Sequence, residues 1–375
     1  MCINKAFVYG KAVGGENFTD RTAETRRLKM NFEAGMNSII ISPRRMGKTS
    51  LVKHVMELVD DSVKVVFMDI YKCRTEYDFL EMFASTLIAS CATKTEQAVE
   101  LAKEMIVSIN PQISFGWGNA TVKFSLGINR KSNTPEEILS LPQRLSEKLG
   151  KHIVVCIDEF QQIGEMPDSL DIQKRLRSVW QHQQDVSYCL FGSKRHLMLN
   201  LFQSKRMPFY QFGDMLFIEK IPTEMWVPFI CERFEASGKN ISETFAQRIC
   251  ETVENYSSYV QQMSWNVFTS TENDVDEEAY RQGFEITMEQ TTPLFVEQTQ
   301  SLTTYQMNLL RAICCDHHTD FMRSEVTDRF PLGTRNNLPR ILNALKEREL
   351  IEMRNDGSYD ISDPMFKLWF ARTMM

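Results

Sequence analysis

Four short apolar runs, separated by helical patterns, constrain the fold more than any other feature of the chain. They are NSIIIS (37–42), VKVVFMDIY (63–71), HIVVCID (152–158) and VSYCLFGS (186–193). Each run is apolar throughout rather than alternating, as expected for strands covered on both faces. Amphipathic stretches lie between the runs, and this alternation predicts a parallel sheet built from right-handed crossovers. A fifth strand, MLFIEKI (215–221), is predicted to complete the sheet.

The rest of the chain predicts an insertion and two further domains. Residues 111–132 alternate like a hairpin around a central Gly-Asn and interrupt the strand–helix pattern. Residues 222–300 are predicted to be helical. From 301 to 375, three helical stretches precede two short strands around Asn-Asp-Gly, which predicts a winged helix-turn-helix. We therefore predict an α/β core over 1–221, a helical domain over 222–300 and a winged helix over 301–375.

The first apolar run leads directly into SPRRMGKTS (42–50), which is similar to the phosphate-loop pattern G-x-x-x-x-G-K-[ST]. A helix N-terminus and backbone N–H groups would bind phosphate there. Gly47 would let the backbone approach the phosphates, Lys48 would reach the β- and γ-phosphates, and Thr49 would ligate Mg²⁺. The nucleotide-binding set predicted from this loop is Ser42, Pro43, Arg44, Arg45, Met46, Gly47, Lys48, Thr49 and Ser50. The alternative interpretation is a basic helix start that contains GKT by chance.

A second candidate site follows the third run, which ends in Asp158 and Glu159. Parallel strands gather ligands at their carboxyl ends, so these acids would face the phosphate loop. Asp158 suits the Mg²⁺ shell together with Thr49, and Glu159 suits a general base for the attacking water. The alternative is that the two acids simply follow the strand and face solvent. This alternative is improbable when a GKT sequence follows another strand of the same predicted parallel sheet.

Two more residues are catalytic candidates. Ser193, at the end of the fourth run, could touch the γ-phosphate or the water, but it could equally cap the following helix. Arg206, in SKRMPFYQFGDM, could act in trans as an arginine finger, although a surface arginine is the commoner case.

These motifs resemble those of the prokaryotic archaeal-type ATPase family, P-loop ATPases of the AAA+/STAND kind that are distantly similar to origin-recognition ATPases. FTDRTAE (18–24) resembles the family's F-x-G-R-x-x-E box, with Asp20 in place of glycine. SPRRMGKTSLV, VVCIDEFQ and YCLFGS resemble its phosphate loop, metal-and-base strand and sensor strand. SSYVQQMSW (257–265) is similar to its lid-helix motif, with Ser257 where proline is usual. YDISDPMFKLWF (359–370) resembles the motif that closes its winged helix.

The resemblance implies a five-stranded parallel sheet of order 5-1-4-3-2 with a helical lid and a C-terminal winged helix. It also implies that ATP and Mg²⁺ bind between sheet and lid, with Phe18 near the base and Arg21 in the nucleotide site. Ser42 in place of glycine could alter the affinity for nucleotide.

Composition and charge narrow the functional classes. The chain has no signal-like start, no apolar run long enough to span a bilayer, and nine scattered cysteines, so we expect a cytoplasmic protein without membrane contact. Residues 251–300 contain ten acidic residues and one basic residue, whereas 301–375 contain ten of each. A winged helix without net charge does not favour DNA, because phosphate neutralisation supplies much of the affinity for DNA.

Three functions remain open. The leading hypothesis is an ATP-hydrolysing switch, slow without a partner, that docks a protein through the winged helix or through the hairpin insertion at Trp117. An ATP-regulated DNA-binding protein is the alternative, and a scaffold that binds nucleotide without hydrolysis is the third. Either oligomeric or monomeric action would fit the sequence.

Overall fold

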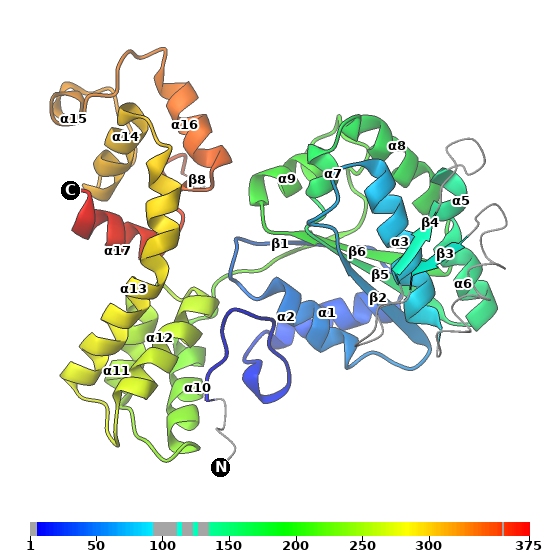
Figure 1. The fold of residues 1–375 in the computed structure, drawn as a ribbon, viewed down its shortest axis with the longest axis horizontal. Coiled ribbons are helices and arrows are strands. Elements are labelled where there is room, and N and C mark those ends of the chain that lie inside the picture. The colour runs from blue at the N-terminus through cyan, green and yellow to red at the C-terminus, as the bar shows by residue number, and fades with distance from the viewer. Residues whose placement is uncertain (1–5, 93–110, 115–122, 127–134, 355) are drawn as a thin grey trace. The chain divides into compact units, whose positions relative to one another are not determined.

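The computed structural model describes residues 6–92, 111–114, 123–126, 135–354 and 356–375 (Figure 1). The chain forms two compact units. One is Ala12–Glu219, and the other combines the residues up to Lys11 with Lys220–Met375. The first unit is thus inserted, as one continuous segment, into the sequence of the second. None of the helices in these described ranges has the length and apolarity needed to cross a membrane.

The unit 12–219 is built on a five-stranded parallel sheet of order β2-β5-β6-β1-β7. If the five strands are numbered along the chain, leaving out the hairpin strands β3 and β4, their order is 2-3-4-1-5. Read from the opposite edge this is 5-1-4-3-2, so the predicted fold class is confirmed. The strands are β1 (Ser38–Ile41), β2 (Val63–Asp69), β5 (His152–Asp158), β6 (Val186–Gly192) and β7 (Asp214–Phe217).

The central strands owe their position to their composition. Every residue of β1 and β6 is buried, as their unbroken apolar runs predict for strands covered on both faces. Helices α1 and α2 lie on one side of the sheet, and α8 and α9 lie on the other (Figure 1). The helices of this unit are α1 (Thr22–Glu33), α2 (Lys48–Met56), α3 (Glu76–Cys91), α5 (Pro135–Leu139), α6 (Leu141–Leu149), α7 (Gln162–Glu165), α8 (Ser169–Trp180) and α9 (Arg195–Gln203).

The predicted hairpin insertion is present as two short antiparallel strands, β3 (Pro111–Ser114) and β4 (Lys123–Leu126). Pro111 pairs with Leu126, and Ser114 pairs with Lys123. The residues that join the strands, including the predicted contact residue Trp117, lie outside the described residues.

The helical part of the second unit consists of α10 (Thr223–Glu235), α11 (Glu243–Thr252), α12 (Ser257–Ser270) and α13 (Glu277–Gln300). The segment before the sheet unit packs into it. The Phe7 ring lies 5.6 Å from that of Phe234 and 6.4 Å from those of Phe229 and Phe268. The Val8 N–H donates a hydrogen bond to Gln261 Oε1 at 3.2 Å. Residues 6–11 therefore belong structurally with helices more than two hundred positions later in the sequence.

Residues from 304 onward form a winged helix. It comprises α14 (Thr304–Cys314), α15 (Ser324–Arg329), α16 (Leu338–Glu347), the antiparallel pair β8 (Ile351–Met353) and β9 (Tyr359–Ile361), and α17 (Pro364–Thr373). Gly357, in the turn between the strands, has a φ of 84°, which favours glycine.

Direct hydrogen bonds join this winged helix to the helical segment. Tyr256 Oη donates to the Ser362 carbonyl at 2.5 Å, and Tyr259 Oη donates to Asp363 Oδ2 at 2.7 Å. Asp363 also caps α17, because its Oδ1 accepts from the N–H groups of Met365 and Phe366. The motifs at 257–265 and 359–370, far apart in the sequence, thus meet at one carboxylate.

Candidate nucleotide site

The predicted phosphate loop connects the end of β1 at Ile41 to the start of α2 at Lys48. Gly47, the residue before the helix, has a φ of 88°, a conformation that only glycine adopts readily. Ser42 is buried and lies outside the left-handed region. The position that is usually glycine therefore requires no glycine conformation in this chain, which explains how a serine can occupy it.

The Lys48 side chain lies over this loop and is 7% exposed. Its ammonium donates hydrogen bonds to the carbonyl oxygens of Pro43 at 2.9 Å and Ser42 at 3.2 Å, and to Ser42 Oγ at 3.4 Å. A buried cation beside a helix N-terminus is a suitable environment for phosphate oxygens.

Thr49 and Asp158 form the second part of the site. Thr49 Oγ1 donates a hydrogen bond to Asp158 Oδ2 at 2.7 Å, which joins the start of α2 to the end of β5. Burial raises the pKa of the Asp158 carboxyl to about 6, against the opposing hydrogen bond from Thr49. A hydroxyl and a carboxylate placed together in this way are oxygen ligands of the kind that Mg²⁺ prefers.

Glu159 follows Asp158 in a left-handed conformation, with a φ of 57°. Its Oε2 accepts a hydrogen bond from Ser193 Oγ at 3.0 Å, and Ser193 directly follows the last residue of β6. A non-glycine residue held in this region is a mark of a constrained, often functional, position. The structure thus brings the two strand ends together, as their topology predicts.

Gln161 is a residue of this site that the sequence analysis missed. Its side-chain amide donates a hydrogen bond to the same Glu159 oxygen, Oε2. The only available signal was its position two residues after Glu159 in DEFQQ, and glutamine there has no distinctive spacing.

The segment before α1 supports the loop. Arg21 is 5% exposed and donates a hydrogen bond from its guanidinium to the Met46 carbonyl at 3.3 Å, while pairing with Glu24 at 3.0 Å. Asp20, which stands where the family pattern has glycine, has a φ of 55°. Aspartate is one of the residue types that tolerate this left-handed conformation. Arg21 thus contacts the backbone of the phosphate loop.

Other predicted residues lie at the periphery of this cluster. The Phe18 ring stacks on His54 of α2 with centroids 4.2 Å apart, and Ser50 Oγ accepts a hydrogen bond from the Val13 N–H at 3.0 Å. Arg45 has a φ of 66° in the turn of the loop, next to Arg44. Arg206 is exposed after α9, and within the described ranges no hydrogen bond or ion pair joins it to the site.

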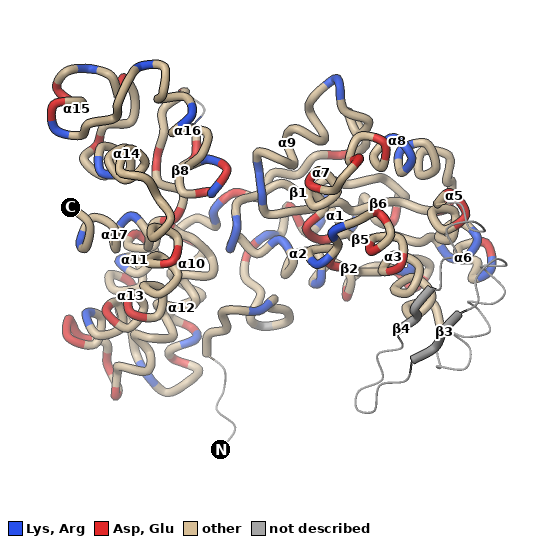
Figure 2. The backbone as a smooth tube through the Cα atoms, turned by 45° about the horizontal axis from the view of Figure 1, so that its top comes forward, with Lys and Arg blue, Asp and Glu red and all other residues tan. Residues whose placement is uncertain are grey.

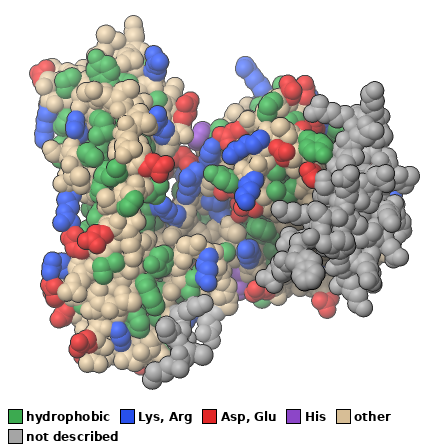
Figure 3. Space-filling view, in the orientation of Figure 1, with side chains coloured by type: hydrophobic (Ala, Val, Ile, Leu, Met, Phe, Trp, Pro, Cys, Tyr) green, Lys and Arg blue, Asp and Glu red, His purple; other side chains and the backbone are tan. Residues whose placement is uncertain are grey.

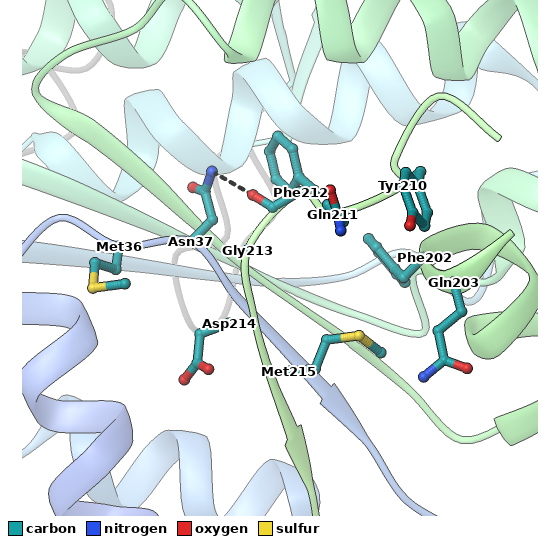
Figure 4. A pocket seen from close by; sticks show the side chains of 10 residues that line it. All are labelled: Met36, Asn37, Phe202, Gln203, Tyr210, Gln211, Phe212, Gly213, Asp214 and Met215. Carbon is teal, nitrogen blue, oxygen red and sulfur yellow. Dashed lines mark hydrogen bonds between the residues drawn. The ribbon is translucent and has the colours of Figure 1, made fainter. Parts of the chain in front are cut away.

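A groove of about 800 Å³ lies at the opposite end of the strands, beside the start of β1 and β7 (Figure 4). Asn37, before β1, and Asp214, which begins β7, both line it, and the Asn37 amide donates to the Phe212 carbonyl at 3.3 Å. Because the phosphate loop follows β1 rather than preceding it, this groove is separate from the candidate nucleotide site.

Comparisons with known proteins agree with this geometry. Residues 18–225 match the model of an ATPase domain predominantly from Archaea, and residues 293–372 match a model described as a probable winged helix domain. No curated protein matches the sequence at a significant level.

Solved structures share the fold over nearly the whole chain. The Walker-type ATPase of Pyrococcus abyssi is 16% identical with a TM-score of 0.72, covering 97% of this chain and 99% of that one. The ORC2 protein of Aeropyrum pernix, in its ADPNP-ADP complexes, is 13% identical with a TM-score of 0.59, covering 96% and 94%. At these identities the likeness shows the fold alone. The ATPase-domain match, which spans more than half of the sequence, shows that the chain belongs to the family of ATPases found predominantly in Archaea.

Proposed function

We propose that the protein is a Mg²⁺-dependent ATPase that acts as a switch, coupling ATP binding and hydrolysis to movement of its helical lid and winged helix. The observation that carries this proposal is one connected cluster. Lys48 and Thr49 begin α2, Thr49 is hydrogen-bonded to Asp158, and Glu159 is hydrogen-bonded to Ser193. Family membership supports nucleotide binding and hydrolysis.

In the proposed reaction, Lys48 and the loop N–H groups hold the phosphates. Thr49 and Asp158 would hold Mg²⁺, which when bound would supply positive charge to the phosphates. Glu159 accepts a proton from the attacking water. The water oxygen bonds to the γ-phosphorus, and the bond to the bridging oxygen breaks, so that ADP leaves with the electron pair.

The second unit supports the coupling part of the proposal. Tyr256 and Tyr259 of the helical segment are hydrogen-bonded to Ser362 and Asp363 of the winged helix. Arg372 of α17 also forms an ion pair with Glu285 of α13 at 2.8 Å. A displacement of the helical segment would therefore carry the winged helix with it, and a partner docked there could sense the nucleotide. The eight described cysteines are free thiols, which suits our proposal of a cytoplasmic protein.

The proposal is tested by single-turnover hydrolysis with the whole chain in excess over ATP. We expect conversion of ATP to ADP and phosphate with Mg²⁺ present, and no conversion in excess EDTA. GTP serves as the comparison for base preference. A chain that neither binds nor converts ATP under these conditions would remove the proposal.

Because Asp158 is a proposed Mg²⁺ ligand, the affinity for Mg²⁺ is expected to depend on pH. The pKa of the Asp158 carboxyl, about 6, lies above the usual value of 3.8 for aspartate, so the folded chain binds this proton more tightly than the unfolded chain does. Its contribution to stability is therefore lost as the pH rises from about 4 to about 6. A protonated carboxyl cannot hold Mg²⁺, so we expect the apparent affinity for Mg²⁺ to fall about tenfold per pH unit below pH 6.

The measurement is a Mg²⁺ titration of ATP-dependent thermal stabilisation at several pH values between 5 and 8. ATP phosphates titrate in the same range, so Asp158→Asn provides the control. That variant should bind Mg²⁺ more weakly and should retain only the pH dependence of ATP itself. Identical pH dependence in both proteins would contradict a metal role for Asp158.

A DNA-linked function remains the second candidate because of the exposed face of α16. Arg340 and Asn343 are exposed there, and Arg335 and Asn336 are exposed just before the helix. No acidic residue occurs between Phe330 and Lys346. Arginine and asparagine at the start of a helix are suited to reading guanine and adenine edges in the major groove.

The surrounding charge opposes this function. Residues 301–375 as a whole carry as many Asp and Glu as Lys and Arg (Figure 2), and both kinds are seen on the visible surface (Figure 3). We expect weak duplex binding at most, lost by 150 mM salt, because the winged helix has no net positive charge. An electrophoretic shift that persists at that salt concentration, and weakens in Arg340→Ala, would favour the DNA-linked function instead.

A further inference from the structure

The hydrogen bonds to Glu159 converge on one of its two carboxylate oxygens. Ser193 Oγ donates to Oε2 at 3.0 Å, and Gln161 Nε2 donates to the same atom. Within the described residues, Glu159 Oε1 accepts no hydrogen bond. Two donors on one oxygen fix the plane of the carboxylate and leave the other oxygen available to a water molecule.

Gln161 is itself held in place by its surroundings. Its side chain is 2% exposed and lies against Gly192, the last residue of β6. A Cβ on Gly192 would lie 1.8 Å from Gln161 Oε1, so only glycine leaves room for this amide. The Phe160 N–H also donates to the Phe191 carbonyl at 2.9 Å, which joins the ends of β5 and β6 beside Gln161.

The amide orientation of Gln161 is costly, which indicates that it serves the site. Gln161 Oε1 is buried, and among the residues that the structure describes it has no hydrogen-bond partner. Turning the amide over would not relieve this, because it would place Oε1 against the carboxylate of Glu159. Buried unsatisfied polar atoms are rare in native proteins, and they concentrate where another requirement outweighs their cost.

We propose that Gln161 is a positioning residue for Glu159: together with Ser193 it holds Oε2, so that Oε1 faces the water that attacks ATP. This role rests on the proposed function, because it presupposes that Glu159 is the general base. Gln161 touches neither the nucleotide nor the water in this scheme. It acts on the rate through Glu159 and leaves the affinity for ATP unchanged.

The first test is Gln161→Leu, which keeps the size of the side chain but removes its donor. We expect the single-turnover rate to fall about 10- to 100-fold, as on loss of one hydrogen bond to a charged group, while the dissociation constant of a non-hydrolysable ATP analogue changes less than about threefold. Gln162→Leu is the matched control. Gln162 is also buried, but its side chain makes no hydrogen bond to Glu159, so its rate should stay within about threefold of the natural chain.

Thermal unfolding of the same two variants separates positioning from packing. If Gln161 positions Glu159, Gln161→Leu should lose rate while it unfolds as cooperatively as Gln162→Leu and binds the analogue like the natural chain. A role in packing alone would lower the stability or the affinity together with the rate.

The outcomes distinguish the two proposals. A natural chain no faster than Glu159→Gln would overturn the proposed function and the role of Gln161 with it. Suppose instead that the natural chain hydrolyses ATP faster than Glu159→Gln does, and that Gln161→Leu is at least as fast as the natural chain. That result would overturn the role of Gln161 alone. A Gln161→Leu variant whose affinity for the analogue falls along with its rate would do the same.

Discussion

Replacing Lys48 by alanine is expected to weaken ATP binding by roughly 30-fold to several thousand-fold. Lys48 is the buried cation of the phosphate loop, and its ammonium already donates to the carbonyls of Ser42 and Pro43. Truncating one partner of a desolvated, hydrogen-bonded charge pair costs about 2–5 kcal/mol, which corresponds to this range in affinity. Equilibrium binding of a fluorescent ATP analogue, with and without Mg²⁺, measures the effect.

Lys53→Ala is the control for Lys48→Ala. Lys53 lies on the same helix but is exposed, with its ammonium 5.2 Å from the centre of the Phe67 ring. We expect its affinity for the analogue to stay within about threefold of the natural chain. Equal binding by Lys48→Ala and the natural chain, with both folded by circular dichroism, would refute the assignment of this loop as the phosphate site.

Replacing Glu159 by glutamine is expected to lower the single-turnover rate about 100- to 10,000-fold, the usual contribution of a general base. Binding of ATP should persist, because the glutamine oxygen can still accept the hydrogen bond from Ser193 that Glu159 Oε2 accepts. Quenched-flow hydrolysis and analogue binding, measured on the same preparation, separate the two effects. The variant would then hold ATP long enough to capture a partner of the bound state.

The same substitution at Glu165 provides a matched control. Glu165 is an exposed residue of α7, and it pairs with Lys194 at 2.6 Å. Glu165→Gln should hydrolyse ATP at close to the natural rate. If Glu159→Gln also kept the natural rate, another group would have to accept the proton, and the role of Gln161 would fail as well.

Much of the architecture was predictable because it depends on local patterns. Unbroken apolar runs predict the central strands, and the structure confirms their parallel pairing and order. The sequence also predicts which strand ends meet, since parallel topology places Ser193 beside Glu159. Ser42 is different: the sequence shows a departure from the pattern, but only the backbone shows that the position needs no positive φ.

The contacts that could not be predicted depend on long-range packing. Nothing in the sequence around Tyr259 or Asp363 indicates that their side chains share a hydrogen bond, because they lie on elements of different predicted domains. Gln161 is similar, since its partner Glu159 is near in sequence but its fit depends on Gly192 of another strand. The sequence prediction places residues 6–11 in the ATPase core, whereas Phe7 packs among Phe229, Phe234 and Phe268. The domain boundaries remain predictions.

The placement of Phe7 has a consequence for how the chain is made on the ribosome. The residues of its aromatic cluster are translated only after the whole of Ala12–Glu219. At roughly 5–20 residues per second, this takes on the order of 10 to 40 s. The sheet unit can complete its own core during that time, since its sequence is continuous. Until then, the apolar residues around Phe7 have no packing partners, because the helices that bury them have not been made. Chaperones that bind exposed apolar segments of nascent chains would therefore reach this segment before those helices do.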